Sequence, residues 1–510
     1  MNIAEKIQQA LLYHRMGDLD NAKIIYQQIL ESEFDNFDAL HLLGLLEFQN
    51  KNFYSAIDLI NKAITSDPNH SIVYCDMGII LTELDNLELA LINFDIAISL
   101  DSLNVRAYYN RAVVLEKLMR YDESLADYDK INEIRPAQGA LRTKFHYNRA
   151  LVLVKLKRFD EAILDFDTAI KGYHENIEGY VNNIGYVTTQ YNKSLTLMLQ
   201  GKLQEGFKLY EWRKKFQRGH LERTFSKPEW LGKESLKNKT ILICGEQGFG
   251  DSIQFCRYVE RVSKLGATVI LEVEPELVDI LSSLYGVSKV IKRGDTLPYY
   301  DFYCHVMSLV QAFDTSLITI PNNVPYLFSD ENKKIYWRDK LKSDKSFKIG
   351  LVWSCVPSAV YRQDYNIQQH KLSKSIPLSY FSIFQNLNVD FYTLQKGELA
   401  LAELTKLEQN NWQGPHIVNC SKELIDFSDT AALIENLDLV ISVDTSVAHL
   451  AGALGKPTWI ITPFDACWRW LSDRDDSPWY PTMKIYRQEY PMAFESVLAR
   501  VKIDLIKLIK

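Results

Sequence analysis

Small side chains return along the first part of this chain at a constant interval of 34 residues. One series consists of Ala10, Gly44, Gly78 and Ala112, and a second of Ala22, Ala56, Ala90 and Ser124. Ala63 and Ala97 keep the same interval, and after a slip of four residues the pattern resumes with Ala150, Ala162 and Ala169. A fixed period of this length predicts an array of stacked supersecondary units, each of which buries its apolar face against the next.

Apolar residues surround these small positions with helical spacing, as do Leu43, Leu46 and Ile60. The small residues let two antiparallel helices approach closely while the apolar ones fill the seam between them. This pattern resembles the tetratricopeptide repeat over residues 1–216. We count five good units and a sixth, degenerate one, which contains Ser194 and Gly206 and ends in the sequence YEWR.

Tetratricopeptide repeats stack into a superhelix whose concave face commonly holds a peptide or protein segment. The resemblance therefore implies a protein partner bound in the repeat groove. The alternative, that the array only supports the other domains or mediates self-association, stays open. The insert at 171–191, rich in Tyr, Asn and Gly, either contacts a partner or caps the array.

Length and composition narrow the class of protein further. A chain of 510 residues exceeds what one core usually serves, so two or three domains are expected. The net charge of −7 provides no basic field for nucleic acid or an anionic membrane, and no apolar run approaches the roughly 18 residues of a membrane span. The N-terminus lacks a signal-peptide core, and the seven scattered cysteines contain no C-x-x-C pair. We expect a cytoplasmic protein with reduced thiols.

From about residue 240, short apolar runs alternate with helical stretches. The predicted strands are 240–244, 268–273, 287–291, 348–354, 390–395, 416–420, 438–443 and 457–462. Near-continuous apolar strands of this kind indicate parallel sheets covered on both faces. The expected fold is an α-solenoid followed by two Rossmann-like α/β domains, divided into 1–216 (solenoid), 217–239 (linker), 240–340, 341–490 and 491–510 (terminal helix). Ligands of such folds bind at the carboxyl ends of the strands.

The first motif with candidate binding or catalytic residues lies at the end of the strand 240–244 and reads CGEQGFGDS. Its glycines permit a tight turn and a close backbone approach, but the spacing fits neither a P-loop nor the dinucleotide fingerprint. Asp251 either caps the following helix or acts as a general base for an acceptor hydroxyl. Gly248, Phe249, Gly250 and Gln254 are the candidate residues of this loop on the acceptor side.

The second motif, SVDTSVAHLAGALGKP at 442–457, reads as strand, turn, helix and next strand. Thr445 and Ser446 stand where hydroxyl and backbone N–H groups can hold a phosphate at a helix N-terminus. Asp444 is a phosphate-site candidate or a helix cap, and His449 is a ligand contact or a packed side chain. Two such turns, one in each α/β domain, favour a nucleotide between them.

These segments, together with FYTLQKG and PFDACWRWLSDRDDSPWYP, resemble bacterial repeat proteins that carry a heptosyltransferase-like domain of glycosyltransferase family 9. The resemblance covers roughly 240–490 and implies the two-domain GT-B fold. It implies an inverting, metal-independent transfer of a sugar from a nucleotide-sugar donor, which is a substrate, so that no cofactor is expected. Asp251 matches the proposed base of that family, and the turn Asp444–Ser446 would hold the donor phosphates.

Three basic residues are further donor-site candidates. Lys374 and Lys396 either contact phosphate or the acceptor, or are solvated surface charges. Arg469, in the sequence WRW, either binds phosphate or forms a salt bridge beside packed tryptophans. The chain departs from the resembling family in the long loop 355–374, where Lys374 replaces an arginine and Arg362 is a possible substitute. This departure leaves the donor preference and the activity open.

No set of His, Cys and carboxylate residues has the spacing of metal ligands, so no metal is expected. The sequence thus predicts a cytoplasmic protein glycosyltransferase whose repeats present a protein acceptor. The alternative is a repeat scaffold with a degenerate GT-B domain that binds only nucleotide or protein.

Overall fold

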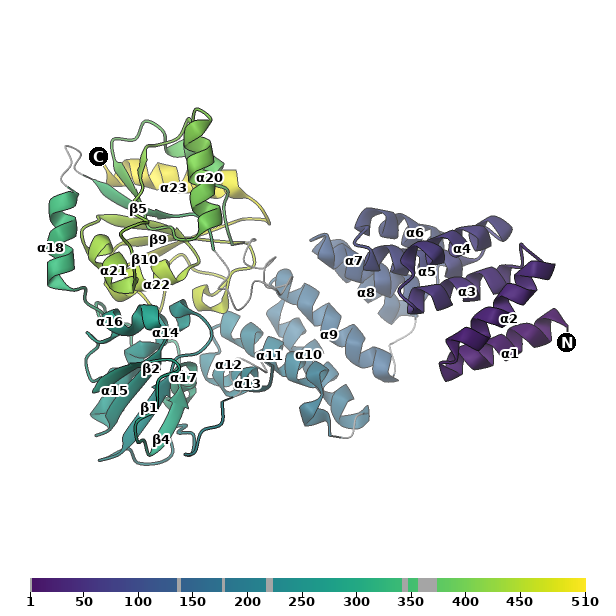
Figure 1. Ribbon diagram of the computed structural model, residues 1–510, viewed down its shortest axis with the longest axis horizontal. Helices are drawn as coiled ribbons and strands as arrows, with labels where there is room; N and C mark the ends of the chain where they lie inside the picture. Colours follow the sequence, from purple (N-terminus) through teal and green to yellow (C-terminus); the bar gives the residue numbers. More distant parts are fainter. Residues whose placement is uncertain (1, 135–138, 177–178, 217–222, 342–346, 356–373) are drawn as a thin grey trace. The chain divides into compact units, whose positions relative to one another are not determined.

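The computed structural model describes residues 2–134, 139–176, 179–216, 223–341, 347–355 and 374–510. Its contacts divide the chain into two compact units, Met1–Tyr180 and Val181–Lys510. Figure 1 shows the helices and strands of both units. Each unit has hydrophobic cores of its own, because the repeat cores contain residues of the first unit only and the largest core contains residues of the second.

Unit 1 is a series of antiparallel helix pairs. Its helices are α1 (Ile3–Met16), α2 (Leu19–Ser32), α3 (Phe37–Gln49), α4 (Phe53–Ser66), α5 (Ser71–Glu83), α6 (Leu87–Leu100), α7 (Val105–Lys117), α8 (Tyr121–Ile134), α9 (Gly139–Lys155) and α10 (Phe159–Asn176). A short 3₁₀ turn, η1 (Tyr180–Asn182), spans the division between the units.

The small residues of the repeat lie where the helices of each pair come closest. An added Cβ at Gly44 would stand 2.9 Å from Cδ1 of Ile60, and one at Gly78 would stand 2.6 Å from Cε1 of Phe94. The alanines of all three series are fully buried. The predicted solenoid of helical repeats is therefore confirmed, and the small residues that recur every 34 positions allow the close helix approach.

Two arginines of unit 1 occupy equivalent places in neighbouring repeats. Arg111 donates from Nε to Asp127 Oδ2 over 2.8 Å and from Nη2 to Asp127 Oδ1 over 2.6 Å. Arg149 binds Asp165 in the same bidentate manner. Such pairs fix the helices of a repeat against each other through well-oriented charged hydrogen bonds.

The degenerate last repeat packs with unit 2. It forms α11 (Ile184–Leu199) and α12 (Leu203–Tyr210), followed by the short α13 (Arg213–Phe216). Met198, Leu203, Phe207 and Tyr210 belong to the same hydrophobic core as the strands of the α/β domains. The predicted solenoid range 1–216 thus extends beyond the division between the two units.

Unit 2 contains two parallel sheets. The first has the strand order β3-β2-β1-β4, with β1 (Thr240–Cys244), β2 (Thr268–Val273), β3 (Lys289–Lys292) and β4 (Phe302–His305). The second has the order β10-β9-β8-β5-β6-β7, with β5 (Lys348–Val352), β6 (Asp390–Thr393), β7 (Ile417–Val418), β8 (Leu439–Val443), β9 (Thr458–Thr462) and β10 (Met483–Arg487).

Helices cover the two sheets. Those of the first are α14 (Phe249–Phe255), η2 (Cys256–Tyr258), α15 (Val259–Lys264), η3 (Pro275–Leu277), α16 (Val278–Leu281), η4 (Val306–Ser308) and α17 (Leu309–Ala312). The helices that accompany the second sheet are α18 (Glu331–Lys340), η6 (Leu378–Phe384), α20 (Glu398–Gln409), α21 (Phe427–Glu435), α22 (Ser446–Ala453), η7 (Trp468–Trp470) and α23 (Phe494–Leu508).

Every ladder in both sheets is parallel, from the pairing of Thr240 with Thr268 in the first to that of Met483 with Thr458 in the second. The carboxyl ends of the strands therefore share one edge in each sheet. This confirms the expected fold class, a repeat solenoid followed by two Rossmann-like domains. The strands β4 and β10 were not predicted from the sequence.

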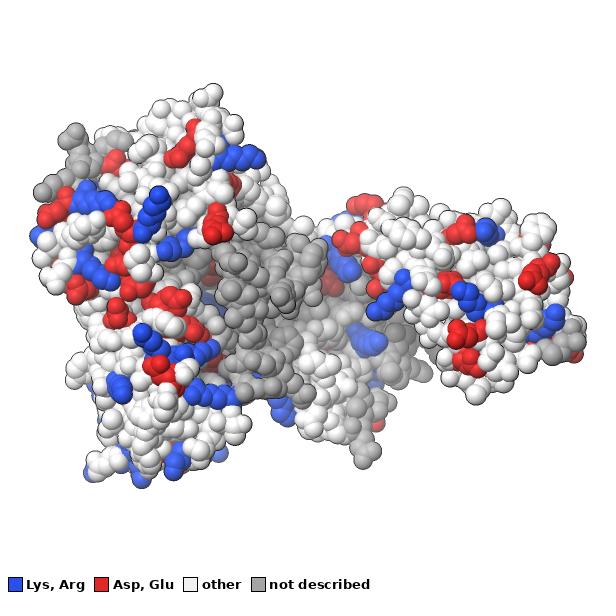
Figure 2. All heavy atoms as spheres, viewed as in Figure 1, with Lys and Arg blue, Asp and Glu red and all other residues white. Residues whose placement is uncertain are grey.

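Charged side chains of both signs are interspersed on the face shown in Figure 2, consistent with the absence of a broad basic field in the sequence. Among the described helices, none is both long and apolar enough to cross a membrane.

Candidate active site

The two sequence motifs lie against each other, although they follow strands of different sheets. The first contains the end of β1 and opens α14, and the second contains the end of β8 and opens α22. An added Cβ at Gly250 would stand 2.8 Å from Cδ2 of His449 and 3.5 Å from Cα of Ser446. The absence of a side chain at Gly250 therefore lets the starts of the two helices come into contact.

Asp251 uses both carboxylate oxygens. Oδ2 accepts the backbone N–H of Gly248 over 2.9 Å, which caps α14, and Oδ1 forms an ion pair with Nη2 of Arg469. Arg469 also donates from Nε to Gln254 Oε1 over 2.9 Å. The capping role expected as one alternative is thus present, and the second oxygen joins the first α/β domain to the second.

Arg469 is held in its charged form. Burial by itself lowers the pKa of its guanidinium, but the neighbouring Cys467 and Asp251 outweigh burial and raise that pKa above its usual range. The guanidinium also lies over the ring of Trp468, with 4.3 Å to the ring centroid. These contacts match the second alternative for the WRW segment, a salt bridge beside packed tryptophans, while phosphate binding by Arg469 stays a prediction.

Lys374 and Asp444 form a second, partly buried ion pair, with Nζ 2.7 Å from Oδ2. Burial opposes both charges, but their mutual attraction raises the pKa of Lys374 above its usual range and lowers that of Asp444. Thr445 is the N-cap of α22, and its hydroxyl lies 3.1 Å from that of Ser442. Ser446, the first helical residue, is partly exposed beside this pair.

His449 is packed rather than charged. Its ring stacks on Trp470 with 5.3 Å between centroids, and Nδ1 lies 3.0 Å from the hydroxyl of Tyr480. Burial lowers the pKa of His449 to about 3 despite the nearby Asp444, so the imidazole is neutral at physiological pH. This surrounding matches the packed alternative that the sequence left open.

Two further candidates serve local structure. Lys396 donates to the backbone carbonyls of Ser421 and Leu424, which fixes the segment after β7. Phe249 packs edge-to-face on Phe427, with 5.2 Å between ring centroids. Arg362 and positions 356–373 of the divergent loop lie outside the described residues.

Sequence reasoning assigned no role to Arg257, a buried arginine that joins the two α/β domains. It donates from Nη1 to the carbonyl of Trp479 over 2.6 Å and lies 4.5 Å from the ring centroid of Tyr480. The signals were present in the segments QFCRY and SPWYP, but neither segment shows by itself that its arginine and tyrosine meet.

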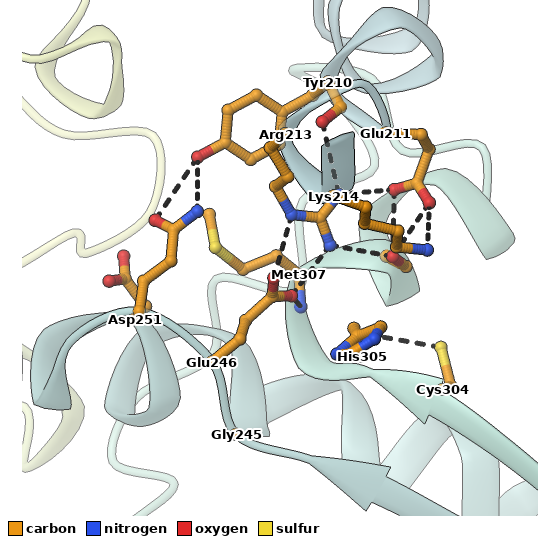
Figure 3. A network of polar contacts seen from close by, with 12 residues as sticks. Tyr210, Glu211, Arg213, Lys214, Gly245, Glu246, Asp251, Cys304, His305 and Met307 are labelled. Atoms are coloured by element: carbon orange, nitrogen blue, oxygen red, sulfur yellow. Dashed lines mark hydrogen bonds and ion pairs between the residues drawn. The ribbon is translucent and has the colours of Figure 1, made fainter. Parts of the chain in front are cut away.

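A second missed group lies at the start of the glycine-rich loop. Glu246 is bound by Arg213 from the end of the last repeat (Figure 3). Gln247 is bound by Tyr210. The sequence YEWR had been noted only as the end of a degenerate repeat.

Some buried polar atoms of the two α/β domains have no hydrogen-bond partner. In the described part of the chain they include Nε2 of Gln254, Nε1 of Trp470 and, at the carboxyl end of β9, Oγ1 of Thr462. A buried donor without a partner costs free energy, and a bound ligand or water is a common reason for its retention. All three atoms can donate to an anionic or hydroxyl-bearing ligand.

The described residues contain no group of three or more His, Cys, Asp and Glu side chains placed to hold a metal ion. An open cavity of about 460 Å³ lies in the second α/β domain, lined by Tyr380, Gln413 and Glu495 among others. None of the predicted site residues lines it, so the chemistry argued from the two motifs does not involve this cavity.

Comparison with known proteins identifies both parts of the chain. The model of glycosyltransferase family 9 (heptosyltransferase) matches residues 402–462, and tetratricopeptide-repeat models match 7–71, 75–139 and 143–171. Protein FlbA of Caulobacter vibrioides is 22% identical over 472 residues, which cover 88% of this chain and 69% of FlbA. DnaJ homolog subfamily C member 7 of Homo sapiens is 30% identical over 92 residues, or 17% of this chain and 19% of that protein.

Similar solved structures include the crystal structure of MamA, which is 22% identical, with a TM-score of 0.30 over 32% of this chain and 95% of that one. Another is YrrB, described as a tetratricopeptide-repeat protein with an unusual peptide-binding site, which is 20% identical, with a TM-score of 0.29 over 34% and 86%. Together with the fold, the family matches lead to one conclusion: the chain combines tetratricopeptide repeats with a glycosyltransferase family 9 (heptosyltransferase) domain.

Proposed function

We propose that the chain transfers a sugar, with inversion and without a metal ion, from a nucleotide-sugar donor to a hydroxyl of a protein acceptor. The observation that carries this proposal is the ion pair between Asp251, in the first motif, and Arg469 of the second α/β domain. A general base and a cation for a leaving phosphate are the two groups that an inverting displacement needs.

In the proposed reaction, Asp251 takes the proton of the acceptor hydroxyl while the oxygen attacks the anomeric carbon. The bond between that carbon and the nucleotide phosphate oxygen breaks, and the phosphate leaves with an additional negative charge. Because Oδ2 of Asp251 caps α14, Oδ1 is the oxygen available to the acceptor. This requires Arg469 to turn from Oδ1 toward the donor phosphate.

The leaving phosphate has a set of candidate partners in the second α/β domain. Arg469 and Lys374 are both charged, and the N-terminal N–H groups of α22, with Thr445 and Ser446, provide uncharged donors. Asp444 keeps Lys374 protonated and orients it, so we assign Asp444 to positioning rather than to direct phosphate contact. His449, which is neutral, would contribute packing or a single hydrogen bond.

The repeats would present the protein acceptor to the transferase domain, and protein glycosylation in the cytoplasm is the proposed setting. All seven cysteines are free thiols, which fits a reducing compartment. The alternative is a scaffold that binds nucleotide without turnover. One observation favours it: Asp251 and Arg469 form an ion pair with each other in this structure, which engages both the proposed base and the proposed phosphate ligand.

Nucleotide binding gives the first test. The full chain is heated with UDP, GDP, ADP, CMP or NAD, and a ligand that binds only the folded state raises the melting temperature. We expect a rise with a single one of the first four nucleotides and none with NAD. No rise with any of them would contradict the transferase proposal.

Catalysis is tested by Asp251→Asn. The amide keeps an oxygen for the N–H of Gly248 but is no longer a base, so we expect turnover to fall by about 10²-fold or more. Nucleotide affinity should stay equal or rise, because the carboxylate that competes with phosphate for Arg469 is gone. The measurements are nucleotide release from UDP-, GDP-, ADP- and CMP-linked sugars and titration calorimetry with the selected nucleotide.

Arg469→Gln is the matched variant on the other side of the ion pair, and it should weaken nucleotide binding. If Asp251→Asn reduces affinity as much as turnover, Asp251 is a structural residue. If Asp251→Asn changes neither turnover nor nucleotide affinity, the general base is another group.

A further inference from the structure

A fully buried arginine connects the end of the last repeat to the glycine-rich loop (Figure 3). Arg213 donates from Nε to Glu246 Oε2 over 2.9 Å and from Nη2 to Glu246 Oε1 over 2.8 Å. The side chains of both residues have 0% exposure to solvent. Burying two charges is costly, and the bidentate geometry is what offsets this cost.

The loop is held from a second side as well. Oε1 of Glu246 also accepts the backbone N–H of Met307, which follows β4, over 3.0 Å. Burial alone would raise the pKa of Glu246, but the adjacent Arg213 lowers it below the usual range. The carboxylate therefore stays charged and ties the loop to both the last repeat and the first sheet.

The next residue of the loop has an unusual backbone conformation. Gln247 has a φ of 59°, in the left-handed region that residues other than glycine rarely adopt. Its side chain donates from Nε2 to the hydroxyl of Tyr210 over 3.1 Å. Such a conformation is unfavourable and persists where the surroundings fix it, which is common near active sites.

Gln247 directly precedes the residue that orients the proposed base. The N–H of Gly248 donates to Oδ2 of Asp251, so the direction of that N–H depends on the backbone at Gln247. Arg213 and Tyr210 act on consecutive loop residues, Glu246 and Gln247, and both come from the short stretch YEWR.

We propose that Arg213 and Tyr210 are positioning residues of the transferase, which fix residues 246–248 so that Asp251 faces the acceptor. This inference rests on the proposed function of Asp251. It assigns the end of the degenerate repeat to the catalytic machinery rather than to acceptor binding in the repeat groove.

Tyr210→Phe tests the inference, because it removes the hydroxyl that binds Gln247 and keeps the ring in the core. In the full chain we expect kcat for nucleotide release from the selected sugar nucleotide to fall about tenfold, equivalent to about 1.4 kcal/mol. The KM for that donor should stay within about twofold, since the donor groups are on the other α/β domain. Amide hydrogen exchange should become faster at 247–251.

Tyr26→Phe is the matched control. Tyr26 is fully buried in unit 1, and among the described residues its hydroxyl has no hydrogen-bond partner. The control should change neither kcat nor exchange at 247–251. Arg213→Lys is the second variant: it keeps the charge but loses the two-pronged geometry, and its kcat should fall at least as far.

The outcomes separate the inference from the function on which it rests. No nucleotide release by the parent chain would contradict the proposed function and the inference with it. Release by the parent chain with an unchanged kcat in Tyr210→Phe, or equal falls in kcat in Tyr210→Phe and Tyr26→Phe, would overturn the inference alone.

Discussion

Gly250 shows how a single missing side chain brings the two motifs together. The space for its Cβ is occupied by the ring of His449, which is itself stacked on Trp470. A ring held on both sides cannot move aside cheaply, because packed interiors have no free volume to accept it.

At this scale we predict that Gly250→Ala destabilises unit 2 by about 1–3 kcal/mol, the usual cost of overpacking. Thermal or denaturant unfolding monitored in unit 2 measures this loss. Gly248→Ala is the control, since its Cβ would meet only Oδ2 of Asp251, at 3.5 Å. Equal losses in the two variants would show that the contact with His449 is not the cause.

Between elements, the connection from α12 to α13 depends on buried charge. Glu211 accepts a hydrogen bond from Arg213 over 2.6 Å and binds Lys214 and Ser308 as well. Burial would raise the pKa of Glu211, but Arg213 and Lys214 lower it from 4.5 to about 2. The unfolded chain therefore binds this proton at a higher pH than the folded chain.

The pH dependence follows from this difference. The stabilisation by the Glu211 carboxylate is fully present above about pH 4.5 and is lost as the pH falls toward 2, with a total of about 3 kcal/mol. We predict that Glu211→Gln lowers stability at pH 7 by up to this amount. The difference in the free energy of unfolding between this variant and the parent chain should shrink as the pH falls from 4.5 toward 2. Unfolding curves recorded across that pH range measure this difference. A difference that stays constant with pH would rule out the charge as the cause.

The sequence patterns predicted some strands accurately and missed others. The strands at 240–244 and 268–273 were predicted to the residue, because each is a continuous apolar run between polar turns. β10 was missed because its alternating sequence, MKIYR, buries only part of its side chains. Edge position does not explain the misses, since the edge strands β3 and β7 were predicted.

The whole molecule has separate cores for its two units, and stability should reflect this separation. Asp127 is buried and depends on Arg111 for its charge partner. Chains with several cores commonly unfold in more than one step.

We predict that Arg111→Met lowers the free energy of unfolding of unit 1 by about 3–5 kcal/mol, the cost of leaving a buried carboxylate unpaired. The midpoint temperature of the unit 2 transition should not change in this variant. The selected nucleotide, in contrast, should raise the midpoint temperature of unit 2 and leave that of unit 1 unchanged. Differential scanning calorimetry of the full chain distinguishes the two. A single transition moved by both changes would contradict this prediction.

The sequence by itself determined the repeat solenoid, the two α/β domains and the two motifs. The reason is that period, apolar runs and glycine-rich turns are local properties of the chain. Only the tertiary structure decided that Asp251 meets Arg469, that Lys374 meets Asp444 and that the last repeat joins unit 2. These contacts link residues far apart in sequence, and their charges and shapes become complementary only when the sheets and helices have packed.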